Sequence, residues 1–297
     1  MIVKVQGLVK RYGDVVAVDR LSFEVRQGEV FGLLGPNGAG KTTTIRVMMD
    51  ILQPDEGEVT ILDQSPRRAK EQVGYLPEER GLYRNLKVLD TLVYLAELKG
   101  LDRATARERA MRLLEQVELA DWAHRKVRDL SRGMQQRLQF VASLVHDPDL
   151  LILDEPFQGL DPLNVERIKS LIADLRQQGK TVLLSTHQMN MVEALCDRIL
   201  LIDRGRRVLY GRLADIKRRY APHAGQVRRQ VVDADPHGVV EVRSDDGAFH
   251  LELAEEATPQ DVLRALLDLG VTVEAFEVSP VPLEDIFVSV VSGGATC

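Results

Sequence analysis

Short apolar runs alternate with helical patterns along residues 1–80 and 148–220. The apolar runs are Val3–Val5, Leu21–Val25, Val30–Leu34, Leu150–Leu153, Thr181–Leu184 and Ile199–Asp203. Runs of this length are typical of buried strands, whereas Asn164–Gln178 has the spacing of a helix. Because strands that alternate with helices usually pair in parallel, this pattern predicts an α/β protein with a mainly parallel sheet.

Residues 84–147 depart from that alternation and are rich in helical patterns. Thr91–Lys99 and Ala104–Leu119 each place leucine, alanine or valine along one broad face of a helix. Apolar stripes of this kind most often pack into a core, and we interpret them so. The pattern therefore predicts a helical subdomain, over about 84–147, inserted between the strands.

Residues 221–297 form a third region with a distinct charge. They contain 4 Lys and Arg against 14 Asp and Glu, a net charge of −10; the whole chain is −6, so residues 1–220 carry +4. Strand-like runs at Val239–Val242, Phe249–Leu253 and Val271–Val278 accompany helical patterns at Ala257–Leu269 and Leu283–Val291. Enough apolar periodicity is present to build a core, so we expect a small folded α/β domain of accessory or regulatory role rather than a disordered tail.

Length and composition limit where the chain can work. At 297 residues it can bury a large core, and it has no run of about 18 apolar residues that would span a membrane. The start Met1–Val5 has no secretory pattern, and the two cysteines, Cys196 and Cys297, lack metal-ligand spacing. These features predict a cytoplasmic protein that reaches a membrane only through a partner.

A glycine-rich segment follows the apolar run Val30–Leu34. It matches G-x-x-x-x-G-K-[ST] and consists of Gly35, Pro36, Asn37, Gly38, Ala39, Gly40, Lys41 and Thr42. Glycines let successive backbone N–H groups turn toward phosphate oxygens, and the helix expected from Thr43 adds its positive N-terminal end. Lys41 would reach the β- and γ-phosphates, and the Thr42 hydroxyl would ligate Mg²⁺. The alternative, an ordinary glycine-rich turn, fits poorly with a strand before it and a helix after it.

Two acids end the strand predicted at Leu150–Leu153. Ligands bind at the C-terminal ends of parallel strands, where Asp154 suits a Mg²⁺ contact and Glu155 suits a general base that polarises the attacking water. A buried strand followed by solvated acids is the alternative, and the phosphate-binding loop makes it the weaker one.

Three shorter segments complete the set of candidate site residues. Ser131 is a good helix N-cap, and Gly133 allows a backbone to approach a phosphate closely. Asp161 lies in a Gly-Leu-Asp-Pro turn soon after Glu155, and His187 follows the strand at Thr181–Leu184. A lone histidine at a strand end is more often structural, but its place in this order favours a catalytic role.

In the order and spacing of these motifs, residues 1–220 resemble the ATP-binding subunits of ABC transporters. By that resemblance, Pro36–Thr42 is the Walker A loop, Leu150–Glu155 the Walker B strand and Asp161 the D-loop acid. Ser131 and Gly133 match the signature sequence, and His187 matches the switch histidine. Tyr12 lies where the family has an aromatic residue that stacks on adenine; the alternative is an amphipathic tyrosine near a strand end.

Two departures from the family pattern stand out. Arg132 and Met134 replace a glycine and the glutamine of the usual L-S-G-G-Q signature, and Glu78 stands where the Q-loop glutamine is expected. A carboxylate can still ligate Mg²⁺, although when ionised it cannot donate a hydrogen bond. Together these segments resemble an export-type subgroup that includes sodium-efflux and drug-export ATPases.

The resemblance implies a P-loop NTPase core with an inserted helical subdomain and a small C-terminal α/β domain at 221–297. It implies an ATPase that uses ATP and Mg²⁺, pairs with a second copy of itself and drives a separate membrane permease from the inner face of the cell membrane. The sequence does not identify the transported substrate, because the residues that contact it would lie in the permease. A soluble ATPase of translation or DNA repair is the main alternative, and a non-hydrolysing scaffold conflicts with Glu155 and His187. A basic run over 204–219 fits a solvated surface in an acidic chain, so no nucleic acid partner is expected.

Overall fold

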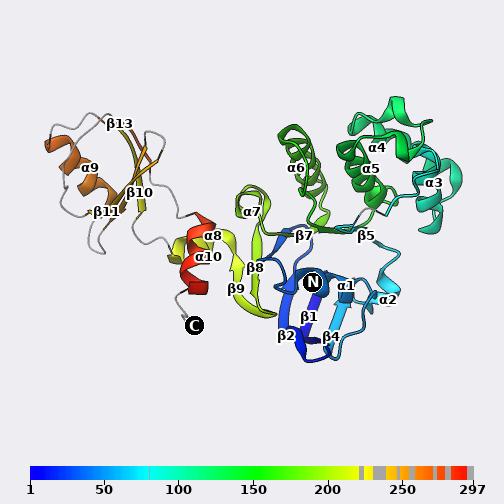
Figure 1. Cartoon of the computed structure of the whole chain (residues 1–297), viewed down its shortest axis with the longest axis horizontal. Helices are drawn as coiled ribbons and strands as arrows, with labels where there is room; N and C mark the ends of the chain where they lie inside the picture. The colour runs from blue at the N-terminus through cyan, green and yellow to red at the C-terminus, as the bar shows by residue number, and fades with distance from the viewer. Residues whose placement is uncertain are drawn as a thin grey trace. The chain divides into compact units, whose positions relative to one another are not determined.

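The computed structural model describes residues 1–79, 81–220, 224–229, 239–245, 248–253, 258–269, 273–277 and 282–292 (Figure 1). The chain divides into two compact units, Met1–Gly211 and Arg212–Cys297, called unit 1 and unit 2 below. Each unit is described by itself.

A six-stranded sheet forms the centre of unit 1, in the order β5-β6-β7-β3-β8-β9. Its strands are β3 (Val30–Leu34), β5 (Val73–Leu76), β6 (Leu150–Asp154), β7 (Thr181–Thr186), β8 (Arg198–Asp203) and β9 (Arg206–Arg212). The pairs β5–β6, β6–β7, β7–β3 and β3–β8 are parallel. Strands β3, β6 and β7 are buried along their whole length, as the short apolar runs that they contain predict. The predicted α/β class with a mainly parallel sheet is confirmed.

A second sheet of three antiparallel strands covers part of unit 1. It contains β1 (Val3–Tyr12), β2 (Val15–Val25) and β4 (Glu56–Ile61), in the order β2-β1-β4. Helix α1 (Lys41–Met48) contacts β2 and β4 on one side and β6 on the other, so it lies between the two sheets (Figure 1). The sequence interpretation missed β4, because the strand is exposed over its first three residues and pairs at a sheet edge.

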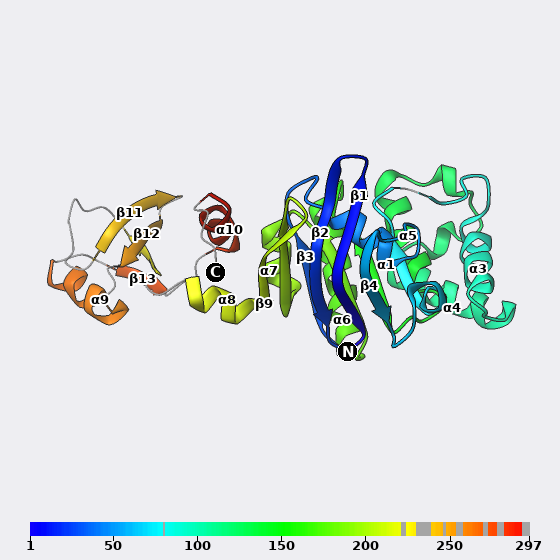
Figure 2. The same ribbon diagram turned by 90° about the horizontal axis from the view of Figure 1, so that it is seen from below.

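Helices gather on one side of unit 1 in both views (Figures 1 and 2). They are α3 (Val88–Leu98), α4 (Arg103–Gln116) and α5 (Arg132–Leu144), joined by 3₁₀ turns at Ala120–Trp122 and Val127–Asp129. These helices bury a hydrophobic cluster of their own, with Leu92, Leu114 and Leu138 fully buried, apart from the cluster between the two sheets. Asp102 and Ser131 accept backbone N–H bonds at the starts of α4 and α5, which fixes where each helix begins.

Each of the remaining helices of unit 1 lies against one of its two sheets. They are α2 (Pro66–Ala69), α6 (Pro162–Gln177) and α7 (Met189–Leu195). Helix α6 contacts β7, and α7 contacts β3 and β7. Asp161 caps α6, and Pro162 occupies its first turn, where the missing N–H costs nothing. Among the residues that the structure describes, no helix combines the length and apolarity needed to cross a membrane.

Unit 2 contains an antiparallel sheet in the order β11-β12-β10-β13. Its elements are α8 (Leu213–Tyr220), β10 (Ala224–Arg229), β11 (Val239–Asp245), β12 (Ala248–Leu253), α9 (Pro259–Asp268), β13 (Val273–Glu277) and α10 (Leu283–Ser292). Helix α8 contacts α10 and so belongs to unit 2, whereas the sequence placed the division after Tyr220. Strand β10 was not foreseen, since Gly225, Gln226 and two arginines interrupt its apolar pattern.

Candidate functional site

The glycine-rich loop runs from the end of β3 into α1, with a backbone that only glycine accommodates at two points. Gly35 and Gly40 have φ of 149° and 104°. A Cβ on Gly35 would lie 2.2 Å from the carbonyl oxygen of Ile202, and one on Gly40 would lie 2.4 Å from that of Ala17. The loop is therefore wedged against neighbouring backbone, and its shape is fixed before any ligand binds.

The turn between β8 and β9 holds this loop from outside. The Gly205 N–H donates to the Ala39 oxygen at 3.0 Å, and the Gly205 oxygen accepts from the Asp19 N–H at 2.9 Å. Pro36, Asn37 and Gly38 are exposed, and Thr43 is half-buried at the start of α1. The outer part of the loop thus faces solvent on a rigid base, as an anion-binding loop requires.

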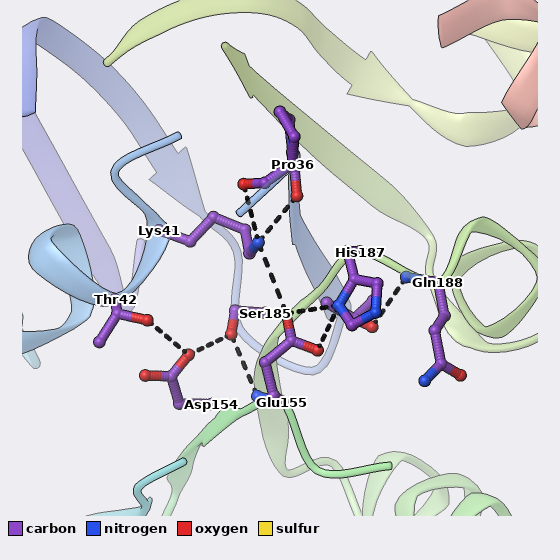
Figure 3. Close-up of polar contacts among 10 residues, drawn as sticks. Pro36, Lys41, Thr42, Asp154, Glu155, Ser185, His187 and Gln188 are labelled. Atoms are coloured by element: carbon purple, nitrogen blue, oxygen red, sulfur yellow. Dashed lines mark hydrogen bonds and ion pairs between the residues drawn. The ribbon is translucent and has the colours of Figure 1, made fainter. Parts of the chain in front are cut away.

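Lys41 lies across the mouth of the loop (Figure 3). Its Nζ donates to the carbonyl oxygens of Gly35 and Pro36 at 2.7 and 3.3 Å, and lies 3.5 Å from Glu155 Oε1. The side chain is only 6% exposed. A buried ammonium needs such partners, and from this position it can also contact a phosphate group held by the loop.

Asp154, at the end of β6, meets two hydroxyl groups (Figure 3). Its Oδ1 accepts from Thr42 Oγ1 at 3.4 Å and also from Ser185 Oγ. Its Oδ2 is buried and has no hydrogen-bond partner. Burial raises the pKa of this carboxyl, against the opposing effect of the two hydroxyl groups. A buried carboxylate oxygen without a partner, beside a threonine hydroxyl, is a suitable donor set for a hard divalent cation.

Glu155 and His187 form a close pair. His187 Nδ1 lies 3.1 Å from both carboxylate oxygens of Glu155, and the Glu155 side chain is buried (Figure 3). The parallel register pairs Asp154 with Ser185, and the Glu155 N–H donates to the Ser185 oxygen at 3.1 Å. Strand pairing therefore brings together a carboxylate and a histidine from separate strands.

Glu78 lies in the loop that follows β5 and lines a cavity of about 180 Å³. Its lining residues are Leu76, Pro77, Glu78, Gln136, Gln139, Asp154, Glu155, Gln158 and Gly159. Gln139 donates to the carbonyl oxygens of Pro77 and Glu79 at 3.4 and 3.0 Å, so α5 holds this loop in place. The structure thus groups Glu78 with the two acids that end β6.

Ser131, Gly133 and Asp161 form a separate group, where the starts of α5 and α6 come together. Ser131 is exposed, and its Oγ accepts from the Met134 N–H at 3.3 Å. A Cβ on Gly133 would lie 3.2 Å from Asn164 Nδ2, and the Asn164 N–H donates to Asp161 Oδ1 at 3.0 Å. That bond holds the pKa of Asp161 below its usual value. No hydrogen bond or ion pair between described residues joins Ser131 to the Lys41–Glu155 pair.

Tyr12 ends β1, away from the contacts described above. Its side chain is 48% exposed, and Lys10 Nζ lies 5.9 Å from the ring centre. An accessible ring of this kind can stack on a nucleotide base.

Sequence reasoning assigned no role to three residues that the structure brings into the site. Ser185 bonds to Asp154 and to the backbone of Glu155, and Gln136 and Gln139 line the cavity. Both glutamines follow Gly133 on the same helix, but the sequence does not show which residues they contact. The contacts of the two glutamines depend on the packing of α5 against the loops that follow β5 and β6. Those of Ser185 depend on the register between β6 and β7.

Two family models match the chain. One, described as ABC transporter, matches residues 18–158, and the other, described as the C-terminal domain of DrrA1-3-like ATP-binding proteins, matches residues 211–291. The second match lies close to the limits of unit 2.

Similar proteins agree with these matches. The uncharacterised ABC transporter ATP-binding protein YhaQ of Bacillus subtilis is 37% identical over 290 residues, which are 96% of each chain. The Nod factor export ATP-binding protein I of Ralstonia nicotianae is 44% identical over 219 residues, which are 71% of this chain and 67% of that protein.

Among solved structures, a dimeric ATP-binding cassette in a post-hydrolysis state with ADP and Pi superimposes with a TM-score of 0.65 at 25% identity. The match covers 71% of this chain and 98% of that one. With the phosphate-binding loop and the two acids of β6 in place, these similarities show that the chain belongs to the ABC transporter family, as an ATP-binding subunit with ATPase activity.

Proposed function

We propose that this chain supplies the ATPase of an exporter, using the five residues that meet at one edge of the parallel sheet. The observation that carries the proposal is the continuous set of contacts from Lys41 to Glu155 to His187, beside Thr42 and Asp154. Each of these residues lies at or directly after the end of a strand, or in the first turn of α1, so their positions are rigid.

In this proposal Glu155 is the general base that accepts a proton from the attacking water. Its burial and its bond to His187 hold the carboxylate in one orientation, and His187 stays within reach of the same water. Lys41 binds the phosphates, and its ammonium offsets negative charge that develops on them. Tyr12 would support the adenine ring by stacking.

Mg²⁺ would be held by Thr42 and Asp154, with Glu78 as a further ligand from the cavity wall. Within the described residues, no group of three or more His, Cys, Asp or Glu is arranged to hold a metal ion. Mg²⁺ is commonly bound by one or two carboxylates together with substrate phosphates, so the donors found here are of the expected kind and number. The cation would supply charge neutralisation at the phosphates.

The active form would be a pair of copies. Among the described residues, no hydrogen bond or ion pair joins Ser131 or Gly133 to the loop of its own chain. Ser131 is exposed at the N-terminal end of α5, where backbone N–H groups can donate hydrogen bonds to an anion. We infer that this segment and Asp161 complete the site of a second copy. The similar cassette with ADP and Pi is described as dimeric, which supports the inference.

A separate membrane permease would be the other partner, with the chain at the inner face of the membrane. Tyr83 is 49% exposed and packs edge-on against Tyr94. Beside it, Leu82, Arg84, Arg128 and Arg132 line a groove of about 340 Å³. Val127 and Leu130 also line the groove, and apolar side chains beside arginines suit a protein contact. The Ralstonia relative is named for export, and no matched name described above points to translation or DNA repair.

The test is the variant Glu155→Gln. Loss of a positioned general base costs about 10²–10⁴ in rate, so turnover should fall by that factor while ATP affinity stays unchanged. The variant with ATP should elute as a dimer, because the bound nucleotide persists. Glu108→Gln, which alters an exposed i,i+4 pair on α4, is the matched control and should keep wild-type turnover.

Wild-type turnover in Glu155→Gln would refute the assignment of the base. A strictly monomeric Glu155→Gln in saturating ATP, with a fully active wild type, would refute the composite site. Crosslinks from Tyr83 that reach only ribosomal or repair proteins would refute the proposal that a membrane permease is the partner.

A further inference from the structure

Gln136 lies in the second turn of α5 and bridges two parts of the site. Its Nε2 donates to the carbonyl oxygen of Pro156 at 3.1 Å, and Pro156 is the residue directly after Glu155. Its Oε1 is buried without a hydrogen-bond partner. The side chain also lines the cavity that contains Asp154 and Glu155. An orphaned buried amide oxygen is costly, which indicates that the position serves more than stability.

The backbone of Glu155 needs support from both sides. Its φ is +50°, in the left-handed region that non-glycine residues rarely adopt, and a following proline further restricts it toward extended backbone. Such strain persists only where the surroundings hold it. On the β7 side, the Glu155 N–H donates to Ser185. On the other side, the Gln136 amide holds the Pro156 carbonyl.

We propose that Gln136 is a positioning residue for Glu155, and that it links the start of α5 to the base. The inference rests on the proposed function of Glu155. Ser131 caps the same helix, so a contact made at Ser131 by a second copy moves the segment that carries Gln136. The rigid helix transmits that contact to the Pro156 carbonyl, and thereby sets the direction of the Glu155 carboxylate.

Other contacts of α5 agree with this role. Gln139, one turn further along, holds the loop that carries Glu78, so the helix reaches both loops of the cavity through side-chain amides. Gln136 has no hydrogen bond to Lys41, Thr42 or any other residue of the phosphate-binding loop. Its loss should therefore change the rate of hydrolysis and leave nucleotide binding intact.

The experiment compares Gln136→Leu with the wild-type full chain in single-turnover hydrolysis at saturating Mg²⁺-ATP. We expect the rate to fall about tenfold or more, because a small misplacement of a catalytic group has effects up to 10²-fold. ATP affinity and ATP-dependent dimerisation should stay within about twofold. Gln116→Leu is the matched control: that glutamine is exposed at the end of α4 and is not among the residues that line the cavity, so its loss should leave the rate unchanged.

A double-mutant cycle separates positioning from a structural role. If Gln136 acts through Glu155, Gln136→Leu should cause no further loss in the Glu155→Gln background, since groups that act as a unit are non-additive. The same factor of loss in both backgrounds would overturn the proposal, and so would a wild-type rate in Gln136→Leu. Gln136→Met, an unbranched side chain of similar length, replaces the leucine variant if that variant unfolds.

The two proposals fail in different ways. If Glu155→Gln itself retained full activity, the assignment of the base would fall. If Glu155→Gln lost activity while Gln136→Leu and Gln136→Met kept it, only the positioning role would fall.

Discussion

Unit 1 and unit 2 are both α/β in composition, yet they differ in what their sheets can present. In unit 1, parallel strands β3, β6 and β7 end at one edge, and the residues that follow them form the candidate site. In unit 2 the strands are antiparallel, so successive strands end at opposite edges. In a parallel sheet, the residues that follow the strands lie together at the C-terminal edge and can form one site. In an antiparallel sheet, such residues are divided between two opposite edges.

Charge separates the two units as well. Unit 2 has 8 Lys and Arg against 15 Asp and Glu, a net charge of −7; the whole chain is −6, so unit 1 carries +1. A near-neutral unit 1 with a lysine at its loop can accept an anionic nucleotide, whereas unit 2 would repel one. Every candidate nucleotide residue lies in unit 1, and we propose a regulatory or dimer-stabilising role for unit 2.

Among the variants that compare the two units, Lys41→Ala should have the largest effect. Removal of a positioned charge from the phosphates should lower turnover by about 10²–10³-fold, and ATP binding should weaken too. Nucleotide titration and steady-state turnover measure the two effects. Lys169→Ala is the control, because it removes an ion pair with Glu166 on α6; it should change neither ATP binding nor turnover. Undiminished ATP binding in Lys41→Ala would mean that the nucleotide is not bound at this loop. It would contradict the assignment of nucleotide binding to unit 1.

Gly35→Ala should destabilise unit 1 next most strongly. The added Cβ meets the Ile202 oxygen at 2.2 Å and also takes an unfavourable φ, so the free energy of unfolding should fall by about 3 kcal/mol. Gly38→Ala, at φ of 79° with nothing within 4 Å, should cost only about 1 kcal/mol. Chemical denaturation followed by the fluorescence of Trp122 in unit 1 distinguishes the variants. Equal losses would show that the close approach to Ile202 does not hold the loop.

Ile286→Ala tests unit 2 in the same way. Ile286 is 1% exposed in α10, and its truncation should lower the stability of unit 2 by about 2 kcal/mol. Val288→Ala, at a side chain that is 53% exposed, should cost less than about 0.5 kcal/mol. Hydrogen exchange in α10 reports the change. ATP turnover of the isolated chain should be the same in both, and a large fall in Ile286→Ala would contradict the separation of the units.

The smallest effect on nucleotide binding should come from removal of unit 2. A chain that ends at Arg212 keeps every candidate nucleotide residue, so its ATP affinity should change by less than about twofold. Dimerisation or the response of the ATPase to the permease should weaken. If both were identical to the full chain, unit 2 would be a passive module.

Local sequence was sufficient for much of this protein. The loop from Gly35 to Thr42 and the acids that end β6 were found from residue type and spacing, because glycine, lysine and buried apolar runs carry their physical meaning in a few adjacent positions. The cap at Ser131 was predicted for the same reason, whereas the capping role of Asp161 was not. The parallel sheet followed from alternation alone.

The tertiary structure decided the contacts between distant segments. Only the pairing of β6 with β7 brings Ser185 to Asp154, and only the packing of α5 brings Gln136 to Pro156. Strand β4 and the membership of α8 in unit 2 were likewise set by their partners. A sequence pattern shows which face of a segment is apolar, but register and packing depend on the whole fold, and they determine which side chains meet.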